Sequence, residues 1–256
     1  MREAGLVTAA ALGAARDALT PGITTRELDA IAAAVIKDAG ATSNFKGYHG
    51  FPATLCISVN DEVVHGIPGD RKIAPGDLVS IDGGAIVSGW HGDSAFSAVV
   101  DPVDSENQRL IDITEQAMWV GIAALASARH VGEIGAAIDD FVTASAADFG
   151  ILEDYVGHGI GTSMHQPPDV LNYRASNLGP KVKPGLCLAI EPMLVAGDIA
   201  TRVLDDDWTV VTEDKRNAAH WEHSVAVHDG GIWVLTAPDG GAAKLAELGV
   251  TVAPLD

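Results

Sequence analysis

Residues 75–82 read PGDLVSID, and residues 184–191 read PGLCLAIE. In each stretch a Pro-Gly turn precedes a short apolar run that ends on a carboxylate, Asp82 in the first and Glu191 in the second. An apolar run bounded by turn residues is typical of a buried strand. The echo therefore predicts two related strands, each with a carboxylate at its end, and it indicates an internal duplication.

Two further echoes occur in the same order along the chain. Residues 65–67 and 158–160 both read HGI, and the helical stretch after residues 21–22 has a counterpart after residues 131–132. Chance is a poorer explanation for three echoes in the same order than for one. No Ser/Gly-rich or Pro-rich linker divides the sequence. We therefore predict a single domain over residues 1–256, made of two pseudo-symmetric halves, roughly 1–115 and 116–256.

Helix signals precede the strands in each half. Thr24 and Glu27 have the spacing of a capping box, and apolar residues at helical spacing follow them. Ser105 and Gln108 repeat that spacing before a long Ala-rich segment, and apolar residues within 134–142 predict a further helix. Helices followed by antiparallel strands in both halves predict an α+β fold with pseudo-twofold symmetry.

The composition limits the class of protein. Hydrophobic residues make up 47% and charged residues 20%, an ordinary globular balance, and the formal net charge of −19 disfavours broad attraction to nucleic acid. No apolar run is long enough to cross a bilayer, and no basic-then-apolar leader is evident. Two cysteines, Cys56 and Cys187, argue against a disulfide framework. We expect a cytoplasmic protein with no specific nucleic-acid or membrane partner.

A second carboxylate follows Asp82 in a hairpin pattern. Residues 83–93 read GGAIVSGWHGD, with a turn at Ser88-Gly89, and this pattern predicts Asp82 and Asp93 on neighbouring strands, facing one another. Close carboxylates repel unless one is protonated or a cation lies between them. Two solvent-facing turn aspartates are the alternative. The apolar run before Asp82, and the echoing strand that ends on Glu191, favour a buried cation site.

Two glutamates are further candidates. Glu191 precedes Pro192, so its strand is predicted to stop there and to present the carboxylate at an edge. Glu222 lies in an alternating stretch that predicts a strand, with Glu222 on the face opposite Trp221 and His223. Considered alone, Glu222 is better interpreted as exposed.

His158 lies in residues 157–161 (GHGIG), and His165 follows. Glycines allow close backbone approach or positive φ. A phosphate-binding loop is the rival interpretation, but no strand-to-helix junction is evident, and residues 164–168 (MHQPP) begin a helix poorly. Two imidazoles beside several carboxylates favour a metal site, and oxygen ligands with one nitrogen suit Mn, Fe, Co or Zn. The remaining histidines are predicted to be structural or surface groups: His49, His91, His130, His220, His223 and His228.

Several separated motifs together resemble one family over nearly the whole chain. The chain is similar to the type I methionine aminopeptidases, and this resemblance implies the pita-bread fold, whose two related halves agree with the duplication. The motifs are residues 47–52 (GYHGFP), 58–68 (SVNDEVVHGIP), 80–82 (SID), 89–93 (GWHGD), 157–161 (GHGIG), 190–193 (IEPM) and 221–224 (WEHS). No single motif is specific, but their combination is.

The resemblance also implies a site. It implies two divalent metal ions (Co, Mn, Fe, Ni or Zn), with Asp93 and Glu222 bridging both. It further implies that His65 and His165 contact the substrate and the developing charge, and Glu191 is the candidate proton shuttle. The implied metal ligands are Asp82, Asp93, His158, Glu191 and Glu222. The implied methionine pocket consists of Phe45, Tyr48, Phe51, Cys56, Met164 and Trp208, of which Phe45 and Met164 depart from the residues usual in relatives.

The implied activity is removal of the initiator methionine from nascent proteins and peptides when the second residue is small. The partners would be polypeptide N-termini, with transient proximity to the ribosome, and we expect a monomer. Two alternatives stay open. One is an Xaa-Pro peptidase of the same fold, which the motif around Tyr48 and Phe51 disfavours. The other is a binding protein that keeps the fold without catalysis, which is expected to have lost ligands that this chain retains.

Overall fold

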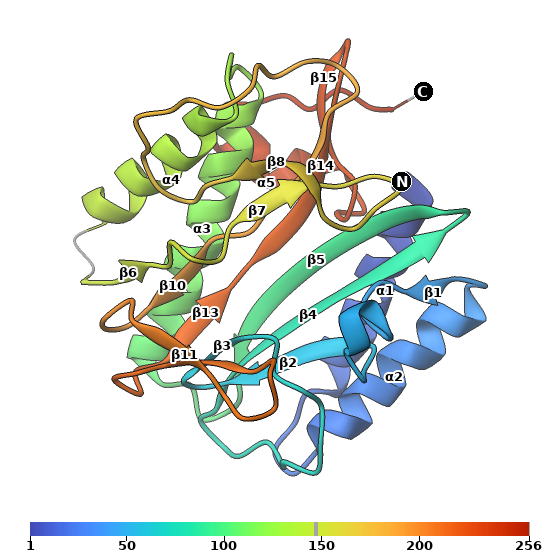
Figure 1. Ribbon diagram of the computed structural model, residues 1–256, viewed down its shortest axis with the longest axis vertical. Coiled ribbons are helices and arrows are strands. Elements are labelled where there is room, and N and C mark those ends of the chain that lie inside the picture. Colours follow the sequence, from blue (N-terminus) through green and yellow to red (C-terminus); the bar gives the residue numbers. More distant parts are fainter. Residues whose placement is uncertain (146–147, 256) are drawn as a thin grey trace.

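The computed structural model describes residues 1–145 and 148–255. In these residues an antiparallel sheet of nine strands runs through the molecule in the order β1–β4–β5–β14–β9–β7–β8, with β2 also beside β4 and β15 beside β14 (Figure 1). The strands of this sheet are β1 (Thr42–Ser43), β2 (Leu55–Val59), β4 (Leu78–Val87), β5 (Trp90–Val99), β7 (Gly157–Gly159), β8 (Gln166–Val170), β9 (Cys187–Ile190), β14 (Glu222–His228) and β15 (Gly231–Val234).

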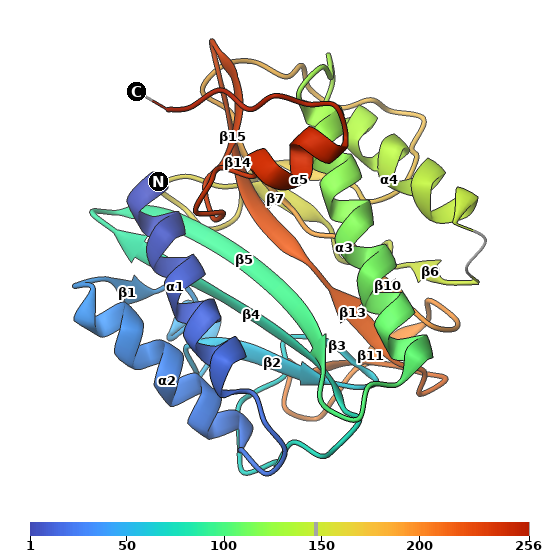
Figure 2. The same cartoon turned by 180° about the vertical axis from the view of Figure 1, so that it is seen from behind.

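Two smaller sheets of three strands and several helices complete the fold. The four long helices lie on one face of the large sheet, and Figure 2 shows them from that side. The smaller sheets consist of β6 (Gly150–Ile151), β10 (Met193–Val195) and β13 (Ala218–His220), and of β3 (Glu62–Val64), β11 (Thr201–Val203) and β12 (Val210–Thr212). The helices are α1 (Arg2–Ala18), α2 (Thr25–Asp38), the 3-10 turn η1 (Tyr48–Gly50), α3 (Ser105–Leu125), α4 (Gly132–Ala144) and α5 (Ala242–Glu247).

The strand order is nearly the same from either side of its centre. From the β5–β14 pair outward, one side continues to β4 and β2 and the other to β9 and β7. β4 and β9 are the strands that follow the two Pro-Gly echoes. The α1–α2 pair packs in the first half and the α3–α4 pair in the second (Figure 2). The dividing point near residue 115 lies inside α3, so the break between the halves comes before that helix.

The HGI echo does not mark equivalent positions. His158 lies in β7 opposite Ala189 of β9, whereas His65 lies after β3 with a φ of 62°. The position in the first half that matches His158 is Ser58, which lies opposite Ser80 of β4. This echo was therefore a coincidence of sequence, while the strand and helix echoes correspond to matching elements.

Helix starts follow local chemistry. Thr24 and Glu27 form the predicted capping box at α2, with both of its hydrogen bonds present. At α3 the prediction was off by one residue: Asp104, not Ser105, accepts the exposed backbone N–H groups of the first turn. Helix α1 was not predicted, because its buried face is mostly small residues, which give weak apolar periodicity.

Two apolar cores lie between the large sheet and the helices. One is formed by α1, α2 and the strands of the first half, and includes Leu28 and Ile81. The other is formed by α3, α4 and the strands of the second half, and includes Met118 and Ile122. Trp221 packs against both cores, so the two cores are in contact within one domain. No helix in the described residues is both long enough and apolar enough to cross a membrane.

Candidate metal centre

The carboxylates of the first half lie side by side on one face of the β4–β5 hairpin. Asp82 pairs with Ala95, and Asp93 pairs with Gly84, so the two aspartates are diagonal neighbours rather than directly opposite. β4 also does not end at Asp82 but continues to Val87. The two glycines after Asp82 do not break the strand, because they remain paired within the ladder.

Glu222 completes a row across three strands. It lies opposite Ala95 on the other side of β5, so Asp82, Ala95 and Glu222 are aligned across β4, β5 and β14. Glu222 has the predicted orientation, opposite in alternation to Trp221 and His223, but it is buried with 2% exposure. The interpretation of Glu222 as exposed, which its sequence alone favoured, was therefore wrong. The pairing of β14 with β5 and β9 removes it from solvent.

The second half contributes Glu191 and His158. β9 ends at Ile190, as the proline after Glu191 predicted. His158 Nδ1 lies 2.9 Å from the carbonyl oxygen of Gly159, and because a carbonyl can only accept, Nδ1 carries the proton. Nε2 then has a free lone pair, and this nitrogen lies 3.3 Å from Glu191 Oε1. Two facing acceptors need a cation or a shared proton between them.

The glycines around His158 serve close packing and not unusual backbone angles. Gly157, Gly159 and Gly161 do not have positive φ. A Cβ on Gly157 would lie 2.3 Å from the carbonyl oxygen of Ala189, and one on Gly159 would lie 2.4 Å from that of Pro167. The glycines therefore let β7 fit between β8 and β9, which holds the imidazole in place. The next element after this segment is the strand β8 and not a helix, which excludes the phosphate-loop interpretation.

The electrostatics of the cluster favour a bound cation. Burial, and secondly the neighbouring carboxylates, raise the pKa of Asp82, Glu191 and Glu222 well above the usual values. Burial raises the pKa of Asp93 to about 7, although a hydrogen bond from Asn44 opposes the shift. One oxygen each of Asp82, Asp93 and Glu222 is buried without a hydrogen-bond partner in the described residues. Buried charge without partners is costly, and a divalent cation would supply the missing interaction.

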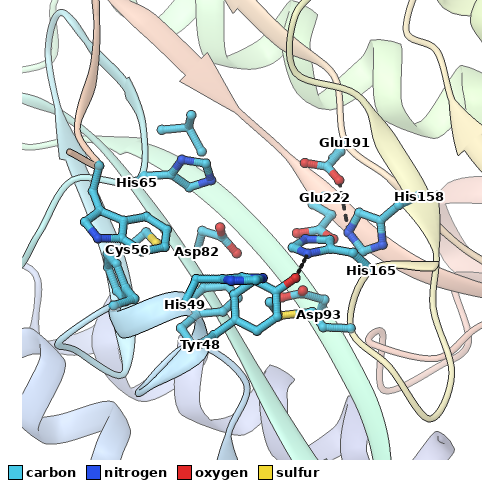
Figure 3. A pocket seen from close by; sticks show the side chains of 15 residues that line it. Tyr48, His49, Cys56, His65, Asp82, Asp93, His158, His165, Glu191 and Glu222 are labelled. Carbon is cyan, nitrogen blue, oxygen red and sulfur yellow. Dashed lines mark hydrogen bonds and ion pairs between the residues drawn. The ribbon is translucent and has the colours of Figure 1, made fainter. Parts of the chain in front are cut away.

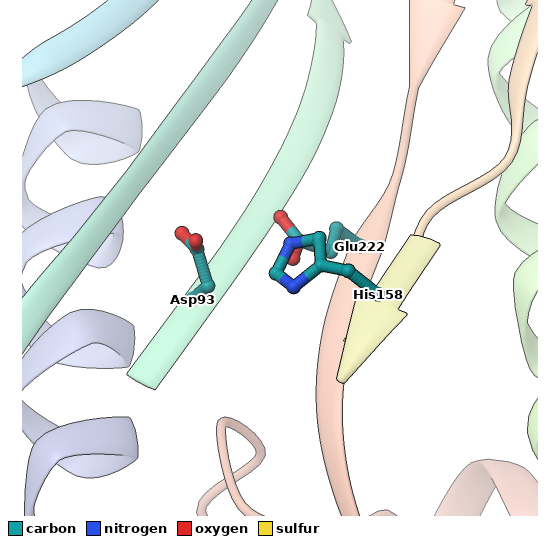
Figure 4. A group of neighbouring side chains, drawn as sticks. All are labelled: Asp93, His158 and Glu222. Carbon is teal, nitrogen blue, oxygen red and sulfur yellow. The ribbon is translucent and has the colours of Figure 1, made fainter. Parts of the chain in front are cut away.

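Three of these residues already have the geometry of a ligand group. One ligand atom from each of Asp93, His158 and Glu222 lies within 4.8 Å of the others (Figure 4). Carboxylate oxygens with one imidazole nitrogen suit a divalent transition metal. Asp82 and Glu191 line the same cavity as this group. All five residues predicted as ligands therefore come together, from five different strands or strand ends.

The cluster lies at one side of a cavity of about 250 Å³ (Figure 3). Phe51 and Trp208 contact edge to face in its lining, with ring centroids 5.0 Å apart. Two lining residues, His49 and Val64, were not predicted as part of the pocket; His49 is exposed, as a surface group would be, and also lines the cavity. Its position inside the motif at residues 47–52 was the signal that could have identified it. The residues predicted for the substrate pocket all line this cavity: Phe45, Tyr48, Phe51, Cys56, Met164 and Trp208.

His65 and His165 also line the cavity and are neutral near pH 7. Burial, and secondly His165, lower the pKa of His65 to about 4. Burial, followed by the nearby His49 and His91, lowers the pKa of His165. The Tyr48 hydroxyl lies 2.8 Å from His165 Nδ1, and the ring centroids of His158 and His165 are 4.3 Å apart.

A buried histidine beside Glu191 was not anticipated as part of the site. His220 is 1% exposed, and its Nε2 has no hydrogen-bond partner in the described residues. That nitrogen lies 3.7 Å from Glu191 Oε2. Burial lowers the pKa of His220 to about 3, so the ring is neutral. Glu191 is thus flanked by His158 on one oxygen and His220 on the other.

Known proteins share this sequence and fold. Residues 1–229 match the sequence pattern of metallopeptidase family M24. A methionine aminopeptidase 1 of Mycobacterium tuberculosis is 47% identical over 241 residues, which cover 92% of this chain and 91% of that protein. The crystal structure of a methionine aminopeptidase from Rickettsia prowazekii has a TM-score of 0.88 at 35% identity, covering 92% of this chain and 95% of the other.

A prolidase from Pyrococcus furiosus has a TM-score of 0.72 at 22% identity, and the match covers 92% of this chain and 62% of the prolidase. This similarity is one of fold alone. The pita-bread α+β fold and the family that the sequence motifs indicated are confirmed. The family, together with the candidate ligand group, indicates that divalent metal ions are used.

Proposed function

The chain belongs to metallopeptidase family M24, and from this premise we propose that it removes the N-terminal methionine from nascent polypeptides and peptides whose second residue is small. The observation that carries this proposal is the position of the buried group Asp93, His158 and Glu222 beside a largely apolar cavity. A hydrolytic centre and a side-chain pocket then share one cavity, as cleavage next to a recognised residue requires.

We propose that two divalent ions would be held by five residues: Asp82, Asp93, His158, Glu191 and Glu222. Bound ions would supply Lewis acidity and lower the pKa of a water nucleophile. The support is that five buried donors line one cavity, more than the group of three needs. Metal-stripped protein titrated separately with Mn, Fe, Co, Ni and Zn should take up two ions by calorimetry. Full activity and stability at one ion per chain would contradict the second site.

The apolar part of the cavity suits a methionine side chain. Phe51 and Trp208 form one wall, and Phe45 contacts Phe51 edge to face with centroids 6.3 Å apart. Cys56 and Met164 are buried in the same apolar cluster. A thioether interacts well with aromatic edges and with polarisable sulfur groups, so this lining favours methionine over a charged or branched polar side chain.

We propose that His165 donates a hydrogen bond to the substrate carbonyl. With the Tyr48 hydroxyl donating to Nδ1 at 2.8 Å, the ring proton resides on Nε2. A neutral imidazole can then donate from Nε2 as charge builds on the carbonyl oxygen. His65, neutral and on the same cavity wall as Trp208, is proposed to contact the substrate near its cleaved end.

Glu191 is proposed to move a proton from the attacking water to the leaving amine. Its pKa is raised by burial and by Asp93, which suits a carboxyl group that must take up and release a proton. His158 and His220 flank its two oxygens and restrict its orientation.

A peptide panel tests the proposed substrate class. Peptides beginning Met-Ala, Met-Gly or Met-Ser should be cleaved, and Met-Leu or Met-Lys should resist, measured as kcat/KM by release of free methionine. Equal rates on Met-Ala and Met-Lys would contradict the proposal. Preference for Xaa-Pro peptides without methionine would instead support a proline-specific peptidase, and no cleavage at all with metal bound would support a binding protein.

We further propose that the enzyme acts as a cytoplasmic monomer on chains leaving the ribosome. Both cysteines, Cys56 and Cys187, are free, which suits a reducing compartment. Sedimentation of the metal-loaded protein should give a single species of one chain. Ribosome pelleting at low and physiological salt should show weak association that is weakest at low salt. The strongly acidic chain is repelled by RNA, and salt screens this repulsion.

A further inference from the structure

A second cavity, of about 290 Å³, lies on the opposite face of the large sheet from the metal centre. It lies between α1 and α3, over β5 and the start of β14, the region visible between those helices in Figure 2. Ser94 and Phe96 line it from β5, next in sequence to Asp93 and Ala95. Trp221 and His223 line it on either side of Glu222. The same two strands therefore present ligands on one face and this cavity on the other.

Arg16 at the rim has unused hydrogen-bonding capacity. In the described part of the chain its guanidinium takes part in no ion pair and no hydrogen bond, and it stacks over Phe96 at 4.0 Å and near Trp221 at 5.7 Å. Stacking holds the plane of the group while leaving its N–H edges free. A guanidinium with free edges is suited to pair with a carboxylate through two parallel hydrogen bonds.

The floor of the cavity supplies one more free donor. Trp221 Nε1 is buried and has no partner in the described residues. Two hydroxyl groups of the cavity are already paired: the Ser94 hydroxyl donates to the carbonyl of Glu222 at 2.6 Å, and Thr236 pairs with His223 Nδ1 at 2.8 Å. The unpaired donors of Arg16 and Trp221 therefore favour a ligand that carries a hydrogen-bond acceptor.

The charge and the walls restrict what that acceptor can be. Glu115 also lines the cavity, and its Oε1 accepts from Trp119 at 3.3 Å and from Lys244 at 2.8 Å. Its charge also stabilises the Arg16 guanidinium, opposing the lowering of the Arg16 pKa by burial. Its negative charge disfavours a ligand with two or more charges, such as a phosphate. The walls are apolar and aromatic, with Leu12, Phe96 and Trp119 among them, so the rest of the ligand should be apolar and flat.

We propose that this cavity is a second ligand site, which binds a small aromatic monocarboxylate with its carboxylate on Arg16 and Trp221 and its ring between Phe96 and Trp119. The site lies apart from the catalytic cavity, and its residues belong to none of the proposed catalytic or metal-binding groups. No partner chain takes part, and because Trp221 Nε1 is shielded from solvent, a small side-chain movement would bring it within reach of the carboxylate.

The test measures binding of 3-phenylpropionate to the metal-loaded full-length protein by calorimetry, with the neutral 3-phenylpropionamide as a matched probe. We expect saturable binding with a Kd of about 1 mM or tighter, and at least tenfold weaker binding of the amide. Arg16→Met keeps the apolar stem and should weaken carboxylate binding on the order of tenfold. Arg26→Met, which removes an exposed arginine paired with Asp70 on α2, is the control and should bind as the wild type does.

A blocking variant locates the site. A Cβ on Gly13, which lines the cavity, meets no atom within 4 Å, so Gly13→Leu should fill the cavity without disturbing α1. Its fold is checked by thermal melting and by peptidase activity, which should be unchanged. Loss of binding in this folded variant supports the proposal. Undiminished binding in Gly13→Leu would place the probe elsewhere, including at the metals, and overturn it. Equal binding of acid and amide, or no saturable binding to the wild type, would overturn it as well.

Discussion

His158 and His165 lie close together, yet their hydrogen bonds give them different chemistry. His158 donates from Nδ1 to a backbone carbonyl, which leaves Nε2 as a lone-pair donor to a metal. His165 Nδ1 pairs with the Tyr48 hydroxyl, a group that can donate or accept; in the proposed mechanism the hydroxyl donates, and Nε2 then carries the ring proton. The backbone carbonyl fixes the tautomer of His158, whereas the Tyr48 hydroxyl allows the opposite tautomer of His165. Two neighbouring histidines can therefore have different chemical roles.

This difference predicts separable effects of two substitutions. His165→Ala should leave metal content unchanged and lower kcat on the order of a hundredfold, with a smaller change in KM, because the lost hydrogen bond forms mainly in the transition state. His158→Ala should instead weaken metal binding. Elemental analysis and steady-state kinetics on both variants are the measurements. Metal loss in His165→Ala together with metal retention in His158→Ala would reverse the two roles.

His220 predicts a change in the pH profile. The neutral ring of His220 places Nε2 3.7 Å from Glu191 Oε2, beyond hydrogen-bond distance, so it acts on the carboxylate as a polar neighbour. Replacing it with an apolar side chain should raise the pKa of Glu191. In His220→Leu the acid limb of kcat should therefore move to higher pH by up to about one unit, less than the loss of a full hydrogen bond to a charged group would give.

His220→Gln retains a donor at a similar reach and should restore the limb toward its original position. A purely structural role for His220 predicts loss of thermal stability with an unmoved limb. That result, or equal profiles for the Leu and Gln variants, would remove His220 from the proton pathway.

At the scale of elements, α1 packs on the sheet through a glycine. A Cβ on Gly5 would lie 2.3 Å from the carbonyl oxygen of Leu235, whereas a Cβ on Gly13 of the same helix meets no atom within 4 Å. Helix propensity favours alanine equally at both positions, by about 1 kcal/mol. Any difference between the two substitutions therefore reports the packing of α1.

Gly5→Ala should lower the free energy of unfolding by about 1–3 kcal/mol, because the backbone must shift to relieve the clash. Gly13→Ala should raise it by up to about 1 kcal/mol. Urea denaturation of both variants with bound metal measures these changes. Shifts of the same sign and size would mean that α1 does not approach the sheet as closely as the structure has it.

At the scale of the whole molecule, the buried carboxylates link stability to pH and metal. The pKa of Asp93 is raised to about 7 by burial, and those of Asp82, Glu191 and Glu222 are raised as well. A carboxyl whose pKa is higher in the folded state binds more protons there than when unfolded. The metal-free protein should therefore lose stability as the pH rises from the ordinary carboxylate range toward 7.

Metal binding should oppose that loss, because ions compete with protons for the same oxygens and favour the folded state. The increase in Tm on adding a saturating divalent ion is predicted to grow between about pH 5 and pH 8. Thermal melts with and without metal across this range measure it. An increase that does not vary with pH would indicate that metal binding displaces no protons from the cluster.

The sequence alone predicted the features that depend on short-range interactions. The capping box at Thr24 and Glu27, the strand end before Pro192 and the hairpin after Asp82 depend on neighbours a few residues away, and each formed. The one-residue error at α3 has the same origin, since Asp104 and Ser105 are both able to cap and only the surrounding backbone selects one. The residue types of the metal cluster, and through the motifs the family, could also be predicted from the sequence.

Tertiary structure alone decided how these residues meet. The alignment of Asp82 and Glu222 on either side of Ala95 depends on the pairing of β14 with β5, which joins the two halves of the chain. That pairing buries Glu222, and the fold brings a buried His220 to Glu191. Sequence specifies side-chain chemistry and short-range hydrogen bonds, whereas burial and the pKa shifts it causes arise only where distant strands exclude water.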